Sequence, residues 1–149
     1  MSLKFWISFC TGALAIGLSA KVEAISSAVN ISTRLAVQTA NNVGIAGFVI
    51  IGSGQKKVCI RALGPTMTSV QGVLADPKLD VYDKTGTVIA SNDNWWSSQQ
   101  DEIMAAGLAP NNDTESGLII TLNPGPYTAI VRGVKNTTGV AMVEVYDVP

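Results

Sequence analysis

Short apolar segments that end in turn-forming residues fill most of this sequence after residue 28, and they restrict the chain to β-rich folds. The first segment alternates apolar or β-branched residues with more polar ones, and its alternating set is Val29, Ile31, Thr33, Leu35 and Val37. A period of two places such a set on one face of a strand. Glycine, proline and asparagine follow several segments, for example at 52–54 and 123–126, as turns require. The pattern therefore predicts a series of short strands.

About eight strands and one short helix are expected. The strand ranges are 29–38, 43–51, 57–63, 78–83, 87–91, 116–122, 127–132 and 140–147. The range 43–51 is apolar on both faces, which predicts a strand covered on both sides. Residues 97–106 lack the strand pattern and are followed by Gly107, so we expect a short helix there. Many short strands with close turns predict an all-β fold, an antiparallel β-sandwich or jelly-roll.

Residues 1–24 are typical of a secretion signal. Lys4 precedes an apolar stretch that ends in Val22-Glu23-Ala24, which matches the pattern before a signal peptidase site. We expect cleavage after Ala24, with Ala20 as the alternative. The stretch is shorter than the ~20 strongly apolar residues of a membrane helix, so we expect a cleaved signal and no membrane contact after cleavage. An uncleaved anchor is the alternative. Residues 25–149 would then form one domain of a secreted, extracellular or cell-surface protein.

The chain is nearly neutral and poor in charge. It has 10 basic and 11 acidic residues, a net charge of −1, and 14% charged residues, against about 25% in typical proteins. Nucleic acids require clustered positive charge on their partners, so none is expected here. A surface with so few charges predicts that part of it is covered, most simply by further copies of the same chain.

The residue types favour a protein without enzymatic activity. The sequence has no histidine, and serine or cysteine nucleophiles normally need a base of that kind beside them. Cys59 is the one cysteine that remains after signal cleavage, and its neighbours Val58 and Ile60 predict a buried thiol. A disulfide to another chain is the alternative. No cofactor is expected, apart from the calcium ion considered next.

Polar oxygen-bearing residues gather in two parts of the sequence. They are Asp80, Asp83, Asn92, Asp93 and Asn94, with Asp113 and Glu115 on a later loop. Calcium takes six to eight oxygen ligands, so these residues form a candidate Ca²⁺ site. The alternative is that they only form turns, in which Asn and Asp bind their own backbone.

Two adjacent tryptophans, Trp95 and Trp96, follow this polar stretch directly. Exposed tryptophans anchor protein interfaces and stack on sugar rings, so an interface or a glycan site is one interpretation. The other is that one ring closes the end of the sandwich and the second packs on the short helix.

The strand at 29–38 has two interpretations. It either completes the sheet of its own chain or is donated to the sheet edge of a neighbouring subunit, with its apolar set in the neighbour's pockets. Head-to-tail donation does not close into a ring of fixed size, so it would build a filament.

Several segments together resemble a β-sandwich module of secreted bacterial proteins that is largely uncharacterised. They are residues 30–34 (NISTR), 47–50 (GFVI), 60–65 (IRALGP), 72–77 (GVLADP), 91–95 (SNDNW) and 126–133 (PYTAIVRG). The second half also resembles bacterial pre-peptidase C-terminal domains, through a strand, turn and glycine unit, an Asn/Asp loop and a later proline-tyrosine strand. Neither resemblance implies an enzymatic activity of the module's own.

These observations predict a secreted structural or adhesive protein that assembles with itself into an extracellular filament or matrix. Two alternatives remain. One is a monomeric glycan-binding module, assisted by calcium, and the other is an accessory domain of a secreted enzyme.

Overall fold

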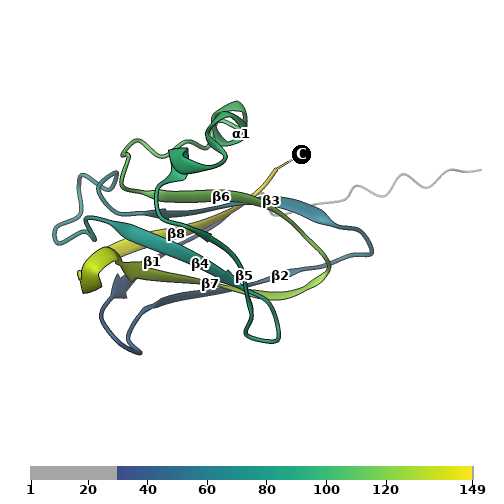
Figure 1. Ribbon diagram of the computed structural model, residues 1–149, viewed down its shortest axis with the longest axis horizontal. Coiled ribbons are helices and arrows are strands. Elements are labelled where there is room, and N and C mark those ends of the chain that lie inside the picture. The colour runs from purple at the N-terminus through teal and green to yellow at the C-terminus, as the bar shows by residue number, and fades with distance from the viewer. Residues whose placement is uncertain (1–29, 149) are drawn as a thin grey trace, which may run out of the picture.

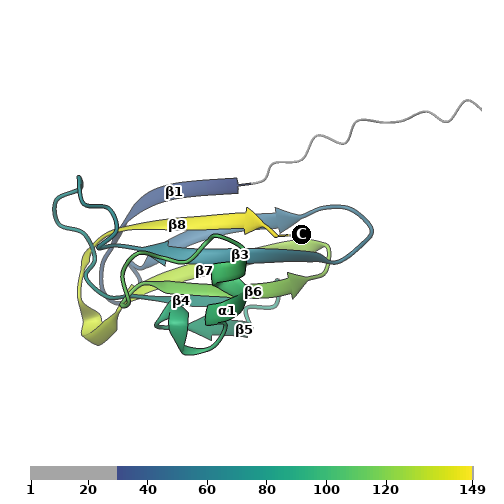
Figure 2. The same ribbon diagram turned by 90° about the horizontal axis from the view of Figure 1, so that it is seen from above.

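The computed structural model describes residues 30–148. The signal at 1–24, the segment 25–28 and Val29 of the first strand lie outside the described residues, so the signal remains a prediction. Within the described range, eight strands form two four-stranded sheets that face each other (Figures 1 and 2). The expected all-β sandwich is confirmed.

Each sheet combines strands that are distant in the sequence. The first sheet has the order β1 (Asn30–Val37), β8 (Gly139–Asp147), β3 (Lys56–Leu63) and β6 (Ser116–Leu122). The second has the order β2 (Gly44–Ile50), β7 (Gly125–Gly133), β4 (Pro77–Tyr82) and β5 (Val88–Asn92). All neighbours are antiparallel. The pairs β1–β8, β2–β7, β3–β6 and β4–β5 are those of one long hairpin wrapped into two layers, which is the jelly-roll arrangement.

The core lies between the two sheets because the alternating apolar residues of the strands point inward. Fully buried members come from both layers, including Ile60 and Val143 in the first sheet and Leu79, Val81 and Val131 in the second. Phe48 of β2 stacks on Tyr127 of β7, with ring centroids 5.7 Å apart. Each fully buried side chain of this size contributes roughly 1.5–3 kcal/mol to folding.

A second, smaller cluster lies on the outer face of the first sheet. The 3₁₀ turn η1 (Trp95–Ser97) and helix α1 (Gln100–Ala105) cover this face, and α1 stands above β6 in Figure 1. The buried members of the cluster are Cys59, Trp95, Ile103, Ile119 and Val148. The short helix expected at 97–106 is confirmed as α1, which is shorter than expected at both ends, and η1 precedes it as a separate turn. None of the helices within residues 30–148, which include the 3₁₀ turn η2 (Val134–Asn136), has the length and apolar character to span a membrane.

The prediction that strand 43–51 is covered on both sides is wrong. This segment forms β2, which lies at the edge of the second sheet and, among the strands that the structure describes, pairs only with β7. Its inward residues Phe48 and Ile50 are buried, but Ile45 and Val49 are 59% and 62% exposed. The first sheet covers one face of β2, and the other face is open.

Candidate functional site

The structure brings together the two polar segments that the sequence singled out, and we call residues 92–97 and 112–116 the polar corner. The backbone N–H of Trp95 donates to the carbonyl of Glu115 (2.9 Å). The indole N–H of Trp96 donates to the carbonyl of Asp113 (3.0 Å). The corner therefore joins the chain after β5 to the chain before β6.

The tryptophan pair is divided between the interior and the surface. Trp95 is 8% exposed and packs with the small cluster under α1, and its indole N–H has no hydrogen-bond acceptor among the described residues. Trp96 is 47% exposed. Because the indole N–H of Trp96 is held by Asp113, the ring face rather than the N–H is available for contact.

The amide of Asn92 organises the polar corner. Its Oδ1 accepts a hydrogen bond from the backbone N–H of Gly117 (3.0 Å), and its Nδ2 donates to the carbonyl of Asn94 (3.1 Å). Ser97 Oγ donates to the same carbonyl (2.6 Å). Asn92 is 6% exposed, so these bonds satisfy a buried amide and hold the turn that leads into η1.

Glu115 is fully buried, and its carboxylate ties down a distant loop. Its Oε1 accepts hydrogen bonds from the backbone N–H groups of Gly64 and Thr66, each at 2.8 Å, and its Oε2 accepts one from the Thr66 hydroxyl. A buried carboxylate needs such donors to offset its lost hydration. Both oxygens of Glu115 are thus engaged in joining the chain after β3 to the polar corner.

The carboxylates of Asp80 and Asp83 are both occupied by hydrogen bonds from groups of the second sheet and its β4–β5 turn. Asp80 pairs with Arg132 of β7 at 2.7 Å and accepts a hydrogen bond from the Ser91 hydroxyl at 2.6 Å. Asp83 lies in the β4–β5 turn and accepts the backbone N–H groups of Thr85 (2.8 Å) and Thr87 (3.0 Å). Hydrogen bonding from the Thr85 side chain and from the Thr87 backbone lowers the pKa of Asp83.

Asp93 is the remaining carboxylate of the polar stretch, and its charge acts on Asp76. Burial raises the pKa of Asp76, the charge of Asp93 raises it further, and Lys135 opposes the change. Across residues 30–148, no three acidic, histidine or cysteine residues gather in a group able to hold a metal ion. The candidate Ca²⁺ site also includes the amide oxygens of Asn92 and Asn94, so it stays a prediction.

The described part of the candidate assembly strand lies in its own sheet. Strand β1 pairs along its whole length with β8, from Asn30 opposite Tyr146 to Val37 opposite Gly139. Val37 is buried and Leu35 packs against the core, whereas Ile31 is 54% exposed and Thr33 is also exposed. The inner face of β1 is therefore covered only at its carboxyl end.

A polar network outside the candidate site residues lies on the outer face of the first sheet. Arg61 donates to the carboxylate of Glu144, to the carbonyl of Leu108 (2.8 Å) and to the hydroxyl of Tyr146 (3.2 Å). Burial raises the pKa of Tyr146, and the charge of Glu144 adds to this effect. The local signal in the sequence is an arginine within the otherwise apolar β3, which predicts a pairing with a carboxylate or a carbonyl, and Arg61 has both. The network anchors the segment after α1 onto the sheet.

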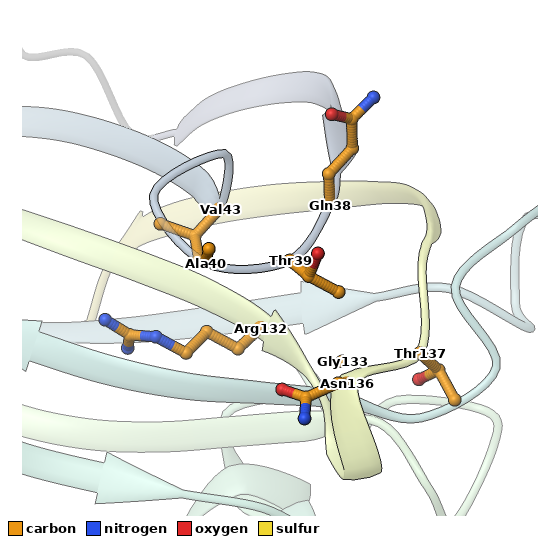
Figure 3. Close-up of a pocket in the computed structure, with 8 residues that line it drawn as sticks. All are labelled: Gln38, Thr39, Ala40, Val43, Arg132, Gly133, Asn136 and Thr137. Atoms are coloured by element: carbon orange, nitrogen blue, oxygen red, sulfur yellow. The ribbon is translucent and has the colours of Figure 1, made fainter.

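A small pocket lies where the β1–β2 loop meets the end of β7 (Figure 3). Its volume is about 140 Å³, and its lining residues are Gln38, Thr39, Ala40, Val43, Arg132, Gly133, Asn136 and Thr137. Pockets that enclose organic ligands generally measure roughly 300–1,000 Å³, so we assign no ligand to this one.

No family model and no curated protein matches this sequence. Among solved structures, the fold is similar to the pre-peptidase C-terminal domain of a collagenase from Bacillus anthracis. The match has a TM-score of 0.50 and 12% sequence identity, and it covers 78% of this chain and 89% of that domain. The distant resemblance noted in the sequence is thus confirmed as a resemblance of fold.

Proposed function

We propose that this chain is a secreted accessory module without catalytic activity, which assists an extracellular protein-degrading enzyme by binding fibrous protein. The observation that carries the proposal is the similarity in fold to a pre-peptidase C-terminal domain of a collagenase, over most of both chains. The lack of histidine in the sequence agrees with a binding role.

Trp96 is the residue we assign to the contact. It combines a 47% exposed ring with an N–H already bonded to the Asp113 carbonyl, so the ring is held in one orientation before binding. A fixed aromatic face loses little conformational freedom when it contacts a partner, which is why tryptophans dominate binding energies.

The test is co-sedimentation of the purified protein with insoluble collagen fibres and, in parallel, with insoluble polysaccharide. We expect binding to the protein fibres, and we expect Trp96→Ala to remove most of it. Met104→Ala is the matched control, because Met104 on α1 is 55% exposed and lies outside the polar corner. Binding to polysaccharide alone would favour the glycan module, and binding to neither would refute the proposal.

A second candidate function is self-assembly through β1, which one observation favours. Ile31 and Thr33 belong to the same face of the strand as the buried Val37, yet both are exposed. Electron microscopy of the secreted protein, with and without EDTA, tests this candidate. Polymers that disappear when residues 25–37 are deleted would support it, and loss in EDTA would indicate a structural calcium ion. Polymers that persist after the deletion would refute it.

A further inference from the structure

The four edge strands of this sandwich differ in how they are protected against pairing with another chain. An edge strand presents unpaired backbone groups, and soluble proteins cover or interrupt such edges. The edge of β6 is closed by side chains. Gln99 Nε2 donates to the carbonyl of Ile119 (2.8 Å), and the Ile119 N–H donates to Gln99 Oε1 (2.9 Å). The N–H of Gly117 on the same edge donates to Asn92 Oδ1.

Strands β5 and β1 are protected by other means. Strand β5 has only 5 residues, and its pairing with β4 is interrupted by a register shift between Val81 and Tyr82. Such irregularities increase the local twist and oppose continued pairing. Strand β1 carries Arg34 together with a polar first half. Charge on an edge strand discourages pairing with an identical strand.

Among residues 30–148, nothing gives strand β2 any of these protections. Its sequence is GIAGFVI, and the range 43–51 contains no charged residue and no proline. On its open face, Ile45 and Val49 are 59% and 62% exposed, and Ile51 just beyond the strand is 87% exposed. Ile45 lies beside Ile130 of β7, and Val49 beside Pro126. The apolar edge thus continues onto the neighbouring strand.

The segment is also complementary to itself. An antiparallel pair related by a two-fold axis at Gly47 places Ile45 of one copy opposite Val49 of the other, and Val43 opposite Ile51. On the inner face, the same register places Ala46 opposite Phe48. Every pair is apolar, and no like charges meet at the axis. A Cβ at Gly47 would touch nothing within 4 Å, so the centre of this pairing is open.

We propose that β2 is a docking edge for a second copy of this chain, through antiparallel pairing of β2 with β2 about a two-fold axis at Gly47. The two second sheets would then join into one continuous sheet. The interface uses the same surface on both copies, so it closes at two subunits and does not propagate. The proposal is independent of the polar corner and of donation by β1, which would propagate.

The first test compares two valines on opposite edges of the second sheet. Val49 on β2 and Val88 on β5 are both exposed, at 62% and 48%. Sedimentation velocity of the wild-type protein at roughly 1–100 μM should show a dimer, which corresponds to a micromolar dissociation constant or tighter. We expect Val49→Lys to weaken dimerisation at least roughly tenfold, because two lysines enter one apolar interface, and Val88→Lys to leave it unchanged.

The second test measures the register. Gly47→Cys is introduced together with Cys10→Ser, so that the buried Cys59 is the only other thiol. Residues directly opposite each other in an antiparallel pair have Cβ atoms roughly 4.5–5.5 Å apart, so a short bifunctional thiol reagent should link the two copies. Val88→Cys in the same background is the control and should remain unlinked.

Each outcome decides the proposal. A dimer that Val49→Lys dissociates and Gly47→Cys captures supports it. A wild-type monomer throughout the concentration range overturns it, as does a dimer that is insensitive to Val49→Lys or equally sensitive to Val88→Lys. Polymers that persist after residues 25–37 are deleted also overturn it, because donation by β1 cannot produce them. Thermal unfolding of each variant shows whether a change in association reflects the edge or a loss of folding.

Discussion

At the scale of single residues, the fold depends on a few buried polar groups whose partners come from distant parts of the chain. Glu115 is the clearest case, because a carboxylate with 0% exposure accepts hydrogen bonds from Gly64 and Thr66. Asn92 is the second case, because its buried side-chain amide bonds to the backbone of Gly117 and Asn94. These side chains hold loops that the apolar core does not reach.

We therefore predict that Glu115→Ala lowers the free energy of unfolding by roughly 2–5 kcal/mol, since buried N–H and O–H donors would lose their acceptor. Urea denaturation measures this change. Glu102→Ala is the matched control. Glu102 forms an exposed ion pair with Lys57 at 3.3 Å, and such pairs contribute about 0–1 kcal/mol. Equal losses in both variants would contradict the role assigned to Glu115.

Cys59 allows a prediction about alkaline pH, and the structure confirms that its thiol is buried. Burial raises its pKa from 9.0 to about 11, against the opposing charge of Arg61. The folded chain thus holds this proton more tightly than the unfolded chain. The resulting stabilisation is complete below about pH 9 and is lost as the pH rises toward 11. We expect the difference in unfolding free energy between wild type and Cys59→Ala to shrink between pH 8 and pH 10.5. A pH-independent difference would contradict this.

At the scale of elements, edge protection distinguishes strands that look alike in the sequence. Strands β2 and β6 are both short and apolar. The side chain of Gln99 hydrogen-bonds to the outer backbone groups of β6, whereas no side chain among the described residues does so for β2. Gln99 lies just before α1, so the helix that completes the small cluster also brings this amide to the edge.

We predict that Gln99→Ala opens the edge of β6. The N–H of Ile119 loses its acceptor, so its amide hydrogen exchange should accelerate, and the unfolding free energy should fall by about 1–2 kcal/mol. Hydrogen exchange followed by mass spectrometry reports this locally. Gln100→Ala is the control, because Gln100 is exposed and should leave exchange at Ile119 unchanged.

The elements also show what the sequence could predict and why the rest remained hidden. Alternation in 29–37 and the apolar run in 57–63 were sufficient to locate β1 and β3, because strand periodicity is a local property. The exposure of Ile45 depends instead on which strands lie beside β2, and its one partner, β7, is far along the chain. Likewise, Asn92 and Glu115 were selected for their oxygen atoms, but their partners Gly117 and Gly64 carried no signal of the contact.

At the scale of the whole molecule, the jelly-roll pairs its strands in a nested order. Among residues 30–148, β4 and β5 are the only paired strands that follow each other in the sequence. The pairs β3–β6, β2–β7 and β1–β8 each enclose the one before. Most contacts of the fold are therefore long in sequence, which slows folding relative to helical proteins. The similarity in fold to a pre-peptidase C-terminal domain covers 78% of this chain, which is far more than one motif.

The uncovered edge of β2 has a consequence for how the chain reaches this state. Strand β2 and its partner β7 lie far apart in the sequence, so both sides of an uncharged strand stay open until this long-range contact forms. Pairing of β2 with its own β7 is a first-order process, whereas pairing of β2 with another molecule accelerates with protein concentration.

We predict that the yield of refolding from urea falls steeply as protein concentration rises, and that Val49→Lys restores it while Val88→Lys does not. A yield independent of concentration in the wild type would contradict this. The same seven residues would then set both the partner of the folded protein and the concentration at which it can fold.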